Sequence, residues 1–178
     1  MAMNLKVEKA LNDQIKWELY SSYLYLSMSS WYESIGLRGF ANWQRIQAME
    51  ERNHALKIYD YVISRGGRII LQSIEAPQSE WESPLAAFCH SLSHEQHVTL
   101  MINDLVNLAI EEKEHATNNM LQWFIDEQIE EEANAGEIVD KLKLIEKDGG
   151  SGMLYMLDKE LGMRIYTPLT PATGSGQQ

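Results

Sequence analysis

The sequence of 178 residues has one cysteine, four prolines and a shortage of positive charge. Because Cys89 is alone, no disulfide can form within the chain, and a reducing cytoplasm is the expected compartment. We find no charged-then-apolar leader and no run of about eighteen apolar residues, so neither secretion nor a membrane span is expected. Fifteen Lys and Arg against twenty-six Asp and Glu give a net charge of −11. This charge disfavours nucleic acid and membrane surfaces as partners and favours cations.

Glycine and proline are missing from long parts of the chain. Neither occurs from Asn4 to Ile35, and after Pro84 the next break is Gly136. These stretches are rich in Leu, Met, Glu, Lys and Gln, which favour helix, and no Asn-Gly turn between alternating runs marks a strand pair. With 44% apolar residues the chain can build a sizeable core. The sequence therefore predicts a single all-α domain.

Hydrophobic periodicity predicts four long helices, over about residues 5–35, 39–65, 84–110 and 115–147, and a short fifth over about 152–163. Ser83-Pro84 supplies an N-cap followed by proline at the first helical position. Short connections make the first two helices antiparallel neighbours, and likewise the third and fourth. The segment from Gly66 to Ser83 can span the bundle, so the second and third helices run parallel through a long crossover. The bundle domain is assigned to residues 1–166, and the uncharged tail 167–178 is expected to be disordered.

Each long helix carries polar residues near the middle of its apolar stripe, where leucine is expected. They are Glu18, Glu51 with His54, Glu95, and Gln128 with Glu131. A buried unpaired carboxylate costs several kcal/mol, and several in one layer repel one another. A bound cation would remove both penalties.

The spacing Glu51-x-x-His54 places a carboxylate and an imidazole side by side on one helix face. This donor pair suits a first-row transition metal better than calcium. A second copy, Glu112-x-x-His115, lies in the charged turn after the third helix and is expected to be an exposed helix end. The polar mid-helix residues on the other three helices favour a metal site at the first copy.

A further acidic set lies beside these positions: Glu50 next to Glu51, and Glu127, Glu130 and Glu131 at i, i+3 and i+4. One interpretation is a solvated acidic face. The other is an additional ion bound next to the proposed pair.

His90, His94 and His97 also have helical spacing, but they lie about 200° round the helix from the stripe. We expect them to face solvent or a subunit interface. Cys89, beside Phe88, is expected to be a small buried hydrophobe.

These residues resemble the bacterial non-haem ferritins from about Asn4 to Gly162. The matching motifs are Trp17-Glu18-Leu19-Tyr20-Ser21-Ser22, Glu50-Glu51-Arg52-Asn53-His54-Ala55, His94-Glu95-Gln96, Leu121-Gln122-Trp123-Phe124 and Glu127-Gln128-Ile129-Glu130-Glu131-Glu132. Ferritin-like di-iron bundles take a Glu from each of two helices and a Glu-x-x-His from each of the other two, and three of these four parts are present. The implied fold is a ferritin-like four-helix bundle with a long crossover and a short C-terminal helix.

The resemblance also implies roles for individual residues. Glu18, Glu51 and His54 would bind a first iron, with Glu51 bridging to a second iron bound by Glu95 and the nearby Gln128. Glu50, Glu127, Glu130 and Glu131 would form a third iron site, and Tyr25 and Trp123 match aromatic residues near the centre.

Two departures separate the chain from the haem-containing bacterioferritins. They place a methionine after the bridging Glu, where this chain has Arg52, so haem is not expected. They also carry a second Glu-x-x-His on the fourth helix, where this chain has Gln128-x-x-Glu131. The second iron would lack an imidazole and be held less tightly.

The resemblance implies an iron-storage ferroxidase that oxidises Fe(II) with dioxygen or peroxide. About two dozen copies would enclose a ferric oxyhydroxide mineral, with the fifth helix near a symmetry axis. Three alternatives remain: a di-iron or di-manganese oxygenase or peroxidase, a DNA-protecting miniature ferritin, and a non-catalytic helical scaffold. Net charge and the acidic fourth helix disfavour the last two, which leaves the oxygenase or peroxidase as the main alternative.

Overall fold

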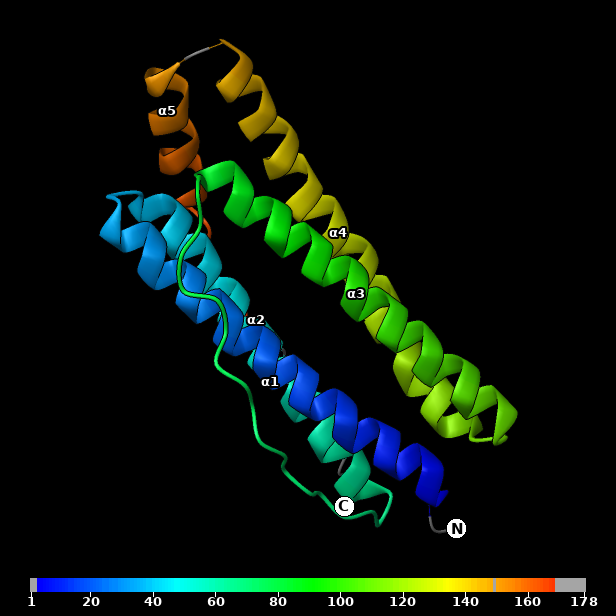
Figure 1. Cartoon of the computed structure of the whole chain (residues 1–178). Helices are drawn as coiled ribbons and strands as arrows, with labels where there is room; N and C mark the ends of the chain where they lie inside the picture. The colour runs from blue at the N-terminus through cyan, green and yellow to red at the C-terminus, as the bar shows by residue number, and fades with distance from the viewer. Residues whose placement is uncertain (1–2, 149, 169–178) are drawn as a thin grey trace, which may run out of the picture.

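The computed structural model describes residues 3–148 and 150–168, and these form five helices and no strand (Figure 1). The helices are α1 (Leu5–Ser34), α2 (Arg38–Ser64), α3 (Pro84–Glu111), α4 (His115–Asp148) and α5 (Ser151–Leu161). Each boundary lies within about two residues of the predicted one, so the all-α prediction is confirmed. Within the described ranges, no helix combines the length and apolar character needed to cross a bilayer.

The four long helices form two antiparallel hairpins, α1 with α2 and α3 with α4, and α1 packs against α3 (Figure 1). The crossover between α2 and α3 has no regular secondary structure and runs the length of the bundle, so α2 and α3 are parallel. Its backbone is held by α1: Ile70 N donates to Asn12 Oδ1 at 2.7 Å, and Ser27 Oγ donates to Gln78 O at 2.7 Å. The predicted long crossover is therefore confirmed.

Helix starts follow local chemistry in two cases and tertiary contact in a third. Asn4 accepts a hydrogen bond from Lys6 N, and Ser83 accepts one from Ala86 N with Pro84 at the first helical position. The N-terminus of α2 has no such cap of its own. Instead, Asp158 Oδ1 of α5 accepts from Gly39 N at 2.7 Å and Phe40 N at 3.1 Å, which pairs free N–H groups with a carboxylate.

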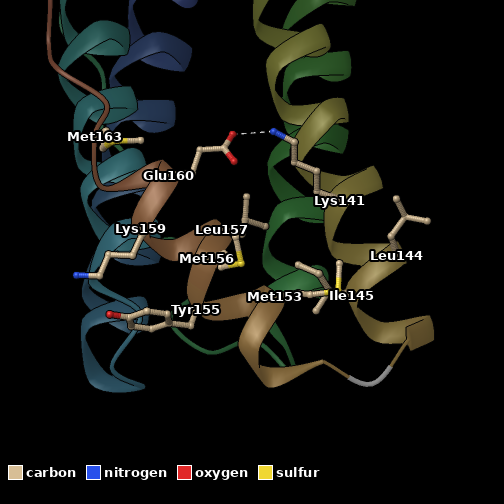
Figure 2. Close-up of a pocket in the computed structure, with 10 residues that line it drawn as sticks. All are labelled: Lys141, Leu144, Ile145, Met153, Tyr155, Met156, Leu157, Lys159, Glu160 and Met163. Atoms are coloured by element: carbon tan, nitrogen blue, oxygen red, sulfur yellow. Dashed lines mark hydrogen bonds and ion pairs between the residues drawn. The ribbon is translucent and has the colours of Figure 1, made fainter.

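The contact between α2 and α5 depends on a glycine. A Cβ atom built at Gly39 would lie 1.6 Å from the backbone oxygen of Asp158, so no larger residue fits without moving α5. On its other side α5 faces α4 across a cavity of about 530 Å³, which Leu144, Ile145, Met153 and Met156 help to line (Figure 2). Lys141 Nζ and Glu160 Oε1 join the two helices 2.7 Å apart beside it (Figure 2).

The apolar core is divided into two clusters by a polar layer. Tyr32, Phe40 and Phe88 are fully buried in the cluster near α5. Leu11 and Ile58 are fully buried in the cluster at the other end. The mid-helix polar residues lie between the two clusters, which fix the helices around them.

Two predictions about α3 are wrong. Cys89 is exposed, because it lies about 100° round the helix from the buried Phe88. His94 is buried and its Nε2 lies 2.7 Å from Ser21 Oγ, although His97 is exposed as predicted and His90 is half-buried. The cause is that α1 covers this side of α3, so the buried arc is wider than one stripe. Burial lowers the pKa of His94 to about 4.

The predicted tail begins within the described residues. Thr167 and Pro168 have no regular secondary structure, and residues 169–178 lie outside the described part of the chain. The assignment of the tail as disordered stays a prediction.

Candidate metal centre

The six mid-helix polar residues from the four long helices are all buried in one layer, as their periodicity predicted. Their exposed fractions are 1% for Glu18 and Glu51, 2% for Glu95, 3% for His54 and Gln128, and 8% for Glu131. Their burial in a layer flanked by apolar clusters excludes a solvated helix face for these positions.

The first group consists of Glu18 from α1 with Glu51 and His54 from α2. His54 Nδ1 lies 3.5 Å from Glu51 Oε2 and 3.9 Å from Glu18 Oε2. One ligand atom from each of the three residues lies within 4.8 Å of the others. These three side chains, predicted as ligands of the first iron, can therefore converge on one ion.

The second group consists of Glu51, Glu95 and Glu131, whose ligand atoms also lie within 4.8 Å of one another. Glu51 belongs to both groups, which is the geometry of a bridging carboxylate. Gln128 lies beside Glu95, where its Nε2 donates to Glu95 O at 3.2 Å and Glu95 Oε2 at 3.3 Å. The structure therefore places Glu131 in the second group, whereas the resemblance assigned it to the third iron site. The Gln128 side chain presents its amide nitrogen to Glu95.

Two glutamines that we did not predict as site residues orient the carboxylates. Gln14 Nε2 donates to Glu18 Oε1 at 2.8 Å, and Gln47 Nε2 donates to Glu51 Oε1 and Glu131 Oε1 at 2.9 Å each. Each glutamine precedes its glutamate by four residues, so one helical turn places both on the same face. This i, i+4 pairing is the sequence signal that could have identified them.

Tyr25 and Trp123 lie next to the layer, as predicted. The buried Tyr25 hydroxyl donates a hydrogen bond to Glu95 Oε1. Burial, followed by the charge of Glu95, raises the pKa of Tyr25 well above its usual value, so the phenol keeps its proton. The half-buried Trp123 ring meets the His54 ring edge-to-face, with centroids 5.3 Å apart.

The buried layer disfavours the charged form of its own carboxyl groups. Burial raises the pKa of Glu18 and Glu95. Burial, reinforced by neighbouring carboxylates, raises the pKa of Glu51 and Glu131 well above the usual range. Without a cation the layer therefore favours protonated carboxyls over the full set of charges.

Two buried carboxylate oxygens, Glu18 Oε2 and Glu131 Oε2, have no hydrogen-bond partner among the described residues. Buried polar atoms are nearly always paired, since an unpaired one costs roughly 1–3 kcal/mol. One of these oxygens belongs to each of the two groups above. A metal ion in each group would give both oxygens a partner, so the donor set fits two cations.

The additional acidic residues are only partly brought together. Glu127 Oε2 lies 4.0 Å from His54 Nε2, and Glu127, His54 and Glu131 form a third convergent group. Glu50 lies outside these groups, and its Oε2 is 2.5 Å from Arg164 Nη2. Glu130 is exposed. A third metal site built from Glu50, Glu127, Glu130 and Glu131 stays a prediction.

The second Glu-x-x-His copy has a structural role. Glu112 accepts hydrogen bonds from Asn4 Nδ2 at 2.7 Å and Lys6 Nζ at 2.5 Å, while His115 is exposed at the start of α4. Glu112 and His115 are absent from the convergent groups found in the described part of the chain. The expected exposed helix end is correct for His115, and Glu112 ties the N-terminus of α1 to the α3–α4 turn.

A model of the Ferritin family, described as a ferritin-like domain, matches residues 8–145. The chain belongs to the ferritin family. The bacterial non-heme ferritin of Bacteroides fragilis strain 638R is 43% identical over 159 residues, which is 89% of this chain and 98% of that protein. The bacterial non-heme ferritin of Staphylococcus saprophyticus is 40% identical over 164 residues, covering 92% and 97%.

Solved ferritin structures agree with this membership. An engineered closed form of the Archaeoglobus fulgidus ferritin superposes with a TM-score of 0.91 and 53% identity, over 93% of this chain and all of that one. A structure described as an open pore ferritin from the same archaeon has a TM-score of 0.89 and 52% identity, over 92% and 100%. The ferritin-like bundle predicted from sequence is therefore confirmed. Membership of this family supports iron storage as the function.

Proposed function

We propose that this ferritin binds two Fe(II) ions in the buried layer, oxidises them with dioxygen or peroxide, and stores the product as a ferric mineral. The observation that carries the proposal is the pair of convergent carboxylate groups, each with one unpaired buried oxygen and with Glu51 common to both. In this proposal Fe(II) is the substrate, and the protein contributes its ligands and a water-poor layer.

Individual residues have distinct parts in the reaction. Glu18, Glu51 and His54 bind the first ion, and Glu51 also faces the second ion beside Glu95 and Glu131. Gln128 and Tyr25 are the further residues that we place at the reacting centre. Tyr25 keeps its proton and orients Glu95, while the amides of Gln14 and Gln47 orient Glu18 and Glu51.

The anionic ligand set accounts for the direction of the reaction. Carboxylates in a low-dielectric layer stabilise Fe(III) more than Fe(II), so they favour loss of an electron from each ion. Two Fe(II), one O2 and two protons give two Fe(III) and one H2O2. Each Fe(III) then reacts with two waters to give FeOOH and three protons.

We further propose that about two dozen copies assemble into a hollow shell around the mineral, as closed symmetric oligomers do. The structural relatives described as open-pore and closed forms of one ferritin support an assembly with a wall. Net charge −11 per subunit would concentrate cations at such a wall.

A di-iron oxygenase or peroxidase acting on an organic substrate remains the second candidate from the ligand set alone. It requires room for that substrate next to the metals. The cavity between α4 and α5 is lined by Met, Leu, Ile, Tyr and Lys side chains and by Glu160, but by none of the carboxylates of the centre (Figure 2). That cavity therefore offers no substrate site next to the metal layer.

The decisive experiment adds Fe(II) aerobically to the metal-free protein and follows ferric absorbance in the ultraviolet together with particle size. We expect rapid oxidation and an electron-dense mineral inside particles of constant outer size. His54→Ala should abolish rapid oxidation while leaving helix content and assembly intact, because it removes the imidazole of the first group.

The chain offers a matched control in its second Glu-x-x-His. His115→Ala removes an exposed histidine at the same spacing from a glutamate, and it should oxidise iron at the parent rate. Oxidation at the parent rate by His54→Ala would contradict the site, and iron precipitation outside the particles would contradict storage.

A further inference from the structure

The segment that follows α5 returns to α2 and places a positive charge beside the metal layer. The chain runs on past Met163 alongside α2 (Figure 2), and Asn42 Nδ2 donates to Arg164 O at 3.1 Å. The Arg164 guanidinium lies 4.5 Å from the centre of the Trp43 ring, and its Nη1 donates to Trp43 O at 3.2 Å. Arg164 is therefore held in one place by several contacts that do not involve the acidic residues.

From this position Arg164 reaches two residues that border the centre. Its Nη2 lies 2.5 Å from Glu50 Oε2, and both Nη atoms donate to Gln47 Oε1 at 3.1 Å. With its oxygen turned to Arg164, the Gln47 amide directs Nε2 at Glu51 and Glu131. A guanidinium is permanently charged and has no lone pair, so it can replace a metal ion as counter-ion but cannot ligate one.

Glu50 is not the only carboxylate outside the inner layer, because Glu127 forms a convergent group with His54 and Glu131. Burial raises the pKa of Glu50 and Arg164 opposes that shift, while the negative charges of Glu127 and Glu130 raise it further. Only Glu50 of the three has an arginine as its ion-pair partner among the described residues. The negative charge nearest to Arg164 is neutralised by the protein itself.

We propose that Arg164 is a tethered counter-ion that occupies Glu50 and that a divalent cation must displace in order to bind the outer carboxylates. Binding at these outer positions is therefore weaker than at the inner layer. An ion that leaves the inner layer is therefore not held tightly by the outer carboxylates. The inference rests on the proposed function, because it presumes metal in the inner layer, but it concerns a residue outside that layer.

The test is a calorimetric titration of the metal-free protein with Zn(II), which is redox-inert, and in a second series with Fe(II) under anaerobic conditions. In the parent we expect two tight equivalents and a weaker outer one. Arg164→Ala should bind the outer equivalent about five- to tenfold more tightly, while the two inner equivalents are retained. Arg164→Gln, which is neutral and polar, provides the same test if the alanine variant folds poorly.

Three further variants isolate the mechanism. Arg164→Lys keeps the charge and should stay close to the parent. In the double variant with Glu50→Gln, Arg164→Ala should no longer raise the affinity for the outer equivalent of metal, because the carboxylate for which Arg164 and the metal compete has been removed. Arg45→Ala removes an equal charge from an exposed position of α2 and should leave the outer affinity unchanged.

Each contrary outcome has a definite meaning. Unchanged or weaker outer binding in Arg164→Ala, an equal gain in Arg164→Lys or Arg45→Ala, or a gain that persists without Glu50 would each overturn the proposal. Loss of the two inner equivalents would show that Arg164 holds the centre together, and would overturn it as well. A parent that binds no divalent cation would refute the proposed function too, whereas two inner equivalents with unaltered variants would refute only this inference.

Discussion

Replacing Glu131 by Gln should stabilise the metal-free protein and weaken its response to metal. Glu131 is buried, one of its oxygens is unpaired, and its charge adds to those of Glu51 and Glu95. The amide has the same shape and retains an oxygen that accepts from Gln47 Nε2, which lies 2.9 Å from Glu131 Oε1. The substitution therefore removes the charge at little cost in packing.

The magnitude follows from what buried charge costs. Replacing a buried ion pair by hydrophobic residues of similar volume is often neutral or stabilises a protein by about 1–4 kcal/mol, because the charges no longer have to be kept out of water. We expect about 1–3 kcal/mol here, because the hydrogen bond from Gln47 is kept. For a chain of this size, 1 kcal/mol corresponds to a change of about 2–4 °C in Tm. The metal-free variant should therefore unfold about 2–12 °C above the parent.

The gain should depend on pH in a definite direction. Burial, and then repulsion from Glu51 and Glu95, raises the pKa of Glu131 well above the ordinary carboxyl value of 4.5. A carboxyl with a raised pKa in the folded state contributes stability that is complete below the unfolded-state pKa and is lost as pH rises through the folded-state pKa. Glutamine does not titrate. The advantage of Glu131→Gln should therefore be small near pH 5 and grow toward pH 8.

The assay is thermal unfolding followed by circular dichroism, on chelator-treated protein and on protein loaded with Zn(II), with particle size checked in each case. Zn(II) should raise the Tm of the parent more than that of Glu131→Gln, because the variant has lost an anionic ligand. Glu146→Gln, at an exposed position of α4, is the control and should change Tm by less than about 1 °C in both states. If Glu131→Gln lowers the Tm of metal-free protein at pH 8, the argument from repulsion is refuted.

Three other predictions concern the outer carboxylates, haem and α5. Glu130→Ala should still bind iron at the paired site but should alter the ratio of iron oxidised to oxygen consumed. Crystals of the parent soaked in Fe(II) should show a third metal peak beside Glu130. If that position is empty while the other two are fully occupied, these glutamates form a solvated acidic face. Protein expressed with abundant haem should show no Soret band, since the exposed Arg52 cannot ligate iron, and stoichiometric haem at that position would contradict this. Gly39→Ala should lower Tm and speed proteolysis at α5, because its Cβ would meet Asp158. The control Gly136→Ala adds a Cβ that meets nothing within 4 Å, so it should be neutral or stabilise the protein by about 0.5–1 kcal/mol. Equal Tm values for the two alanine variants would rule out the close contact.

The helices and the polar layer were predictable from sequence because both are signalled locally. Helix ends depend on residues such as Ser83 and Pro84 that act on their own turn. The layer was visible as a break in the apolar periodicity at the middle of each long helix. Helices of similar length that pack side by side bring their midpoints to one level, so the break predicts a shared site.

What sequence could not supply depends on how the helices are rotated and what covers them. Gln128 and Glu131 lie on the same stripe, and only the packing of α3 and α4 against α1 and α2 decides which of them enters the centre. His94 is buried because α1 covers that side of α3, which no pattern within α3 reveals. Arg164 is more than one hundred residues from Glu50 in sequence, and its contact depends on the return of the chain after α5.

The division into hairpins has a consequence for how the protein folds. One hairpin carries Glu18, Glu51 and His54, and the other carries Glu95 and Glu131. Each hairpin is closed by a short turn, which favours its formation before the two hairpins dock. Docking of the two hairpins adds the repulsion between Glu51 of one hairpin and Glu95 and Glu131 of the other. A divalent cation present at that moment would act as an assembly factor, so docking should be slow in a chelator and accelerate with metal concentration.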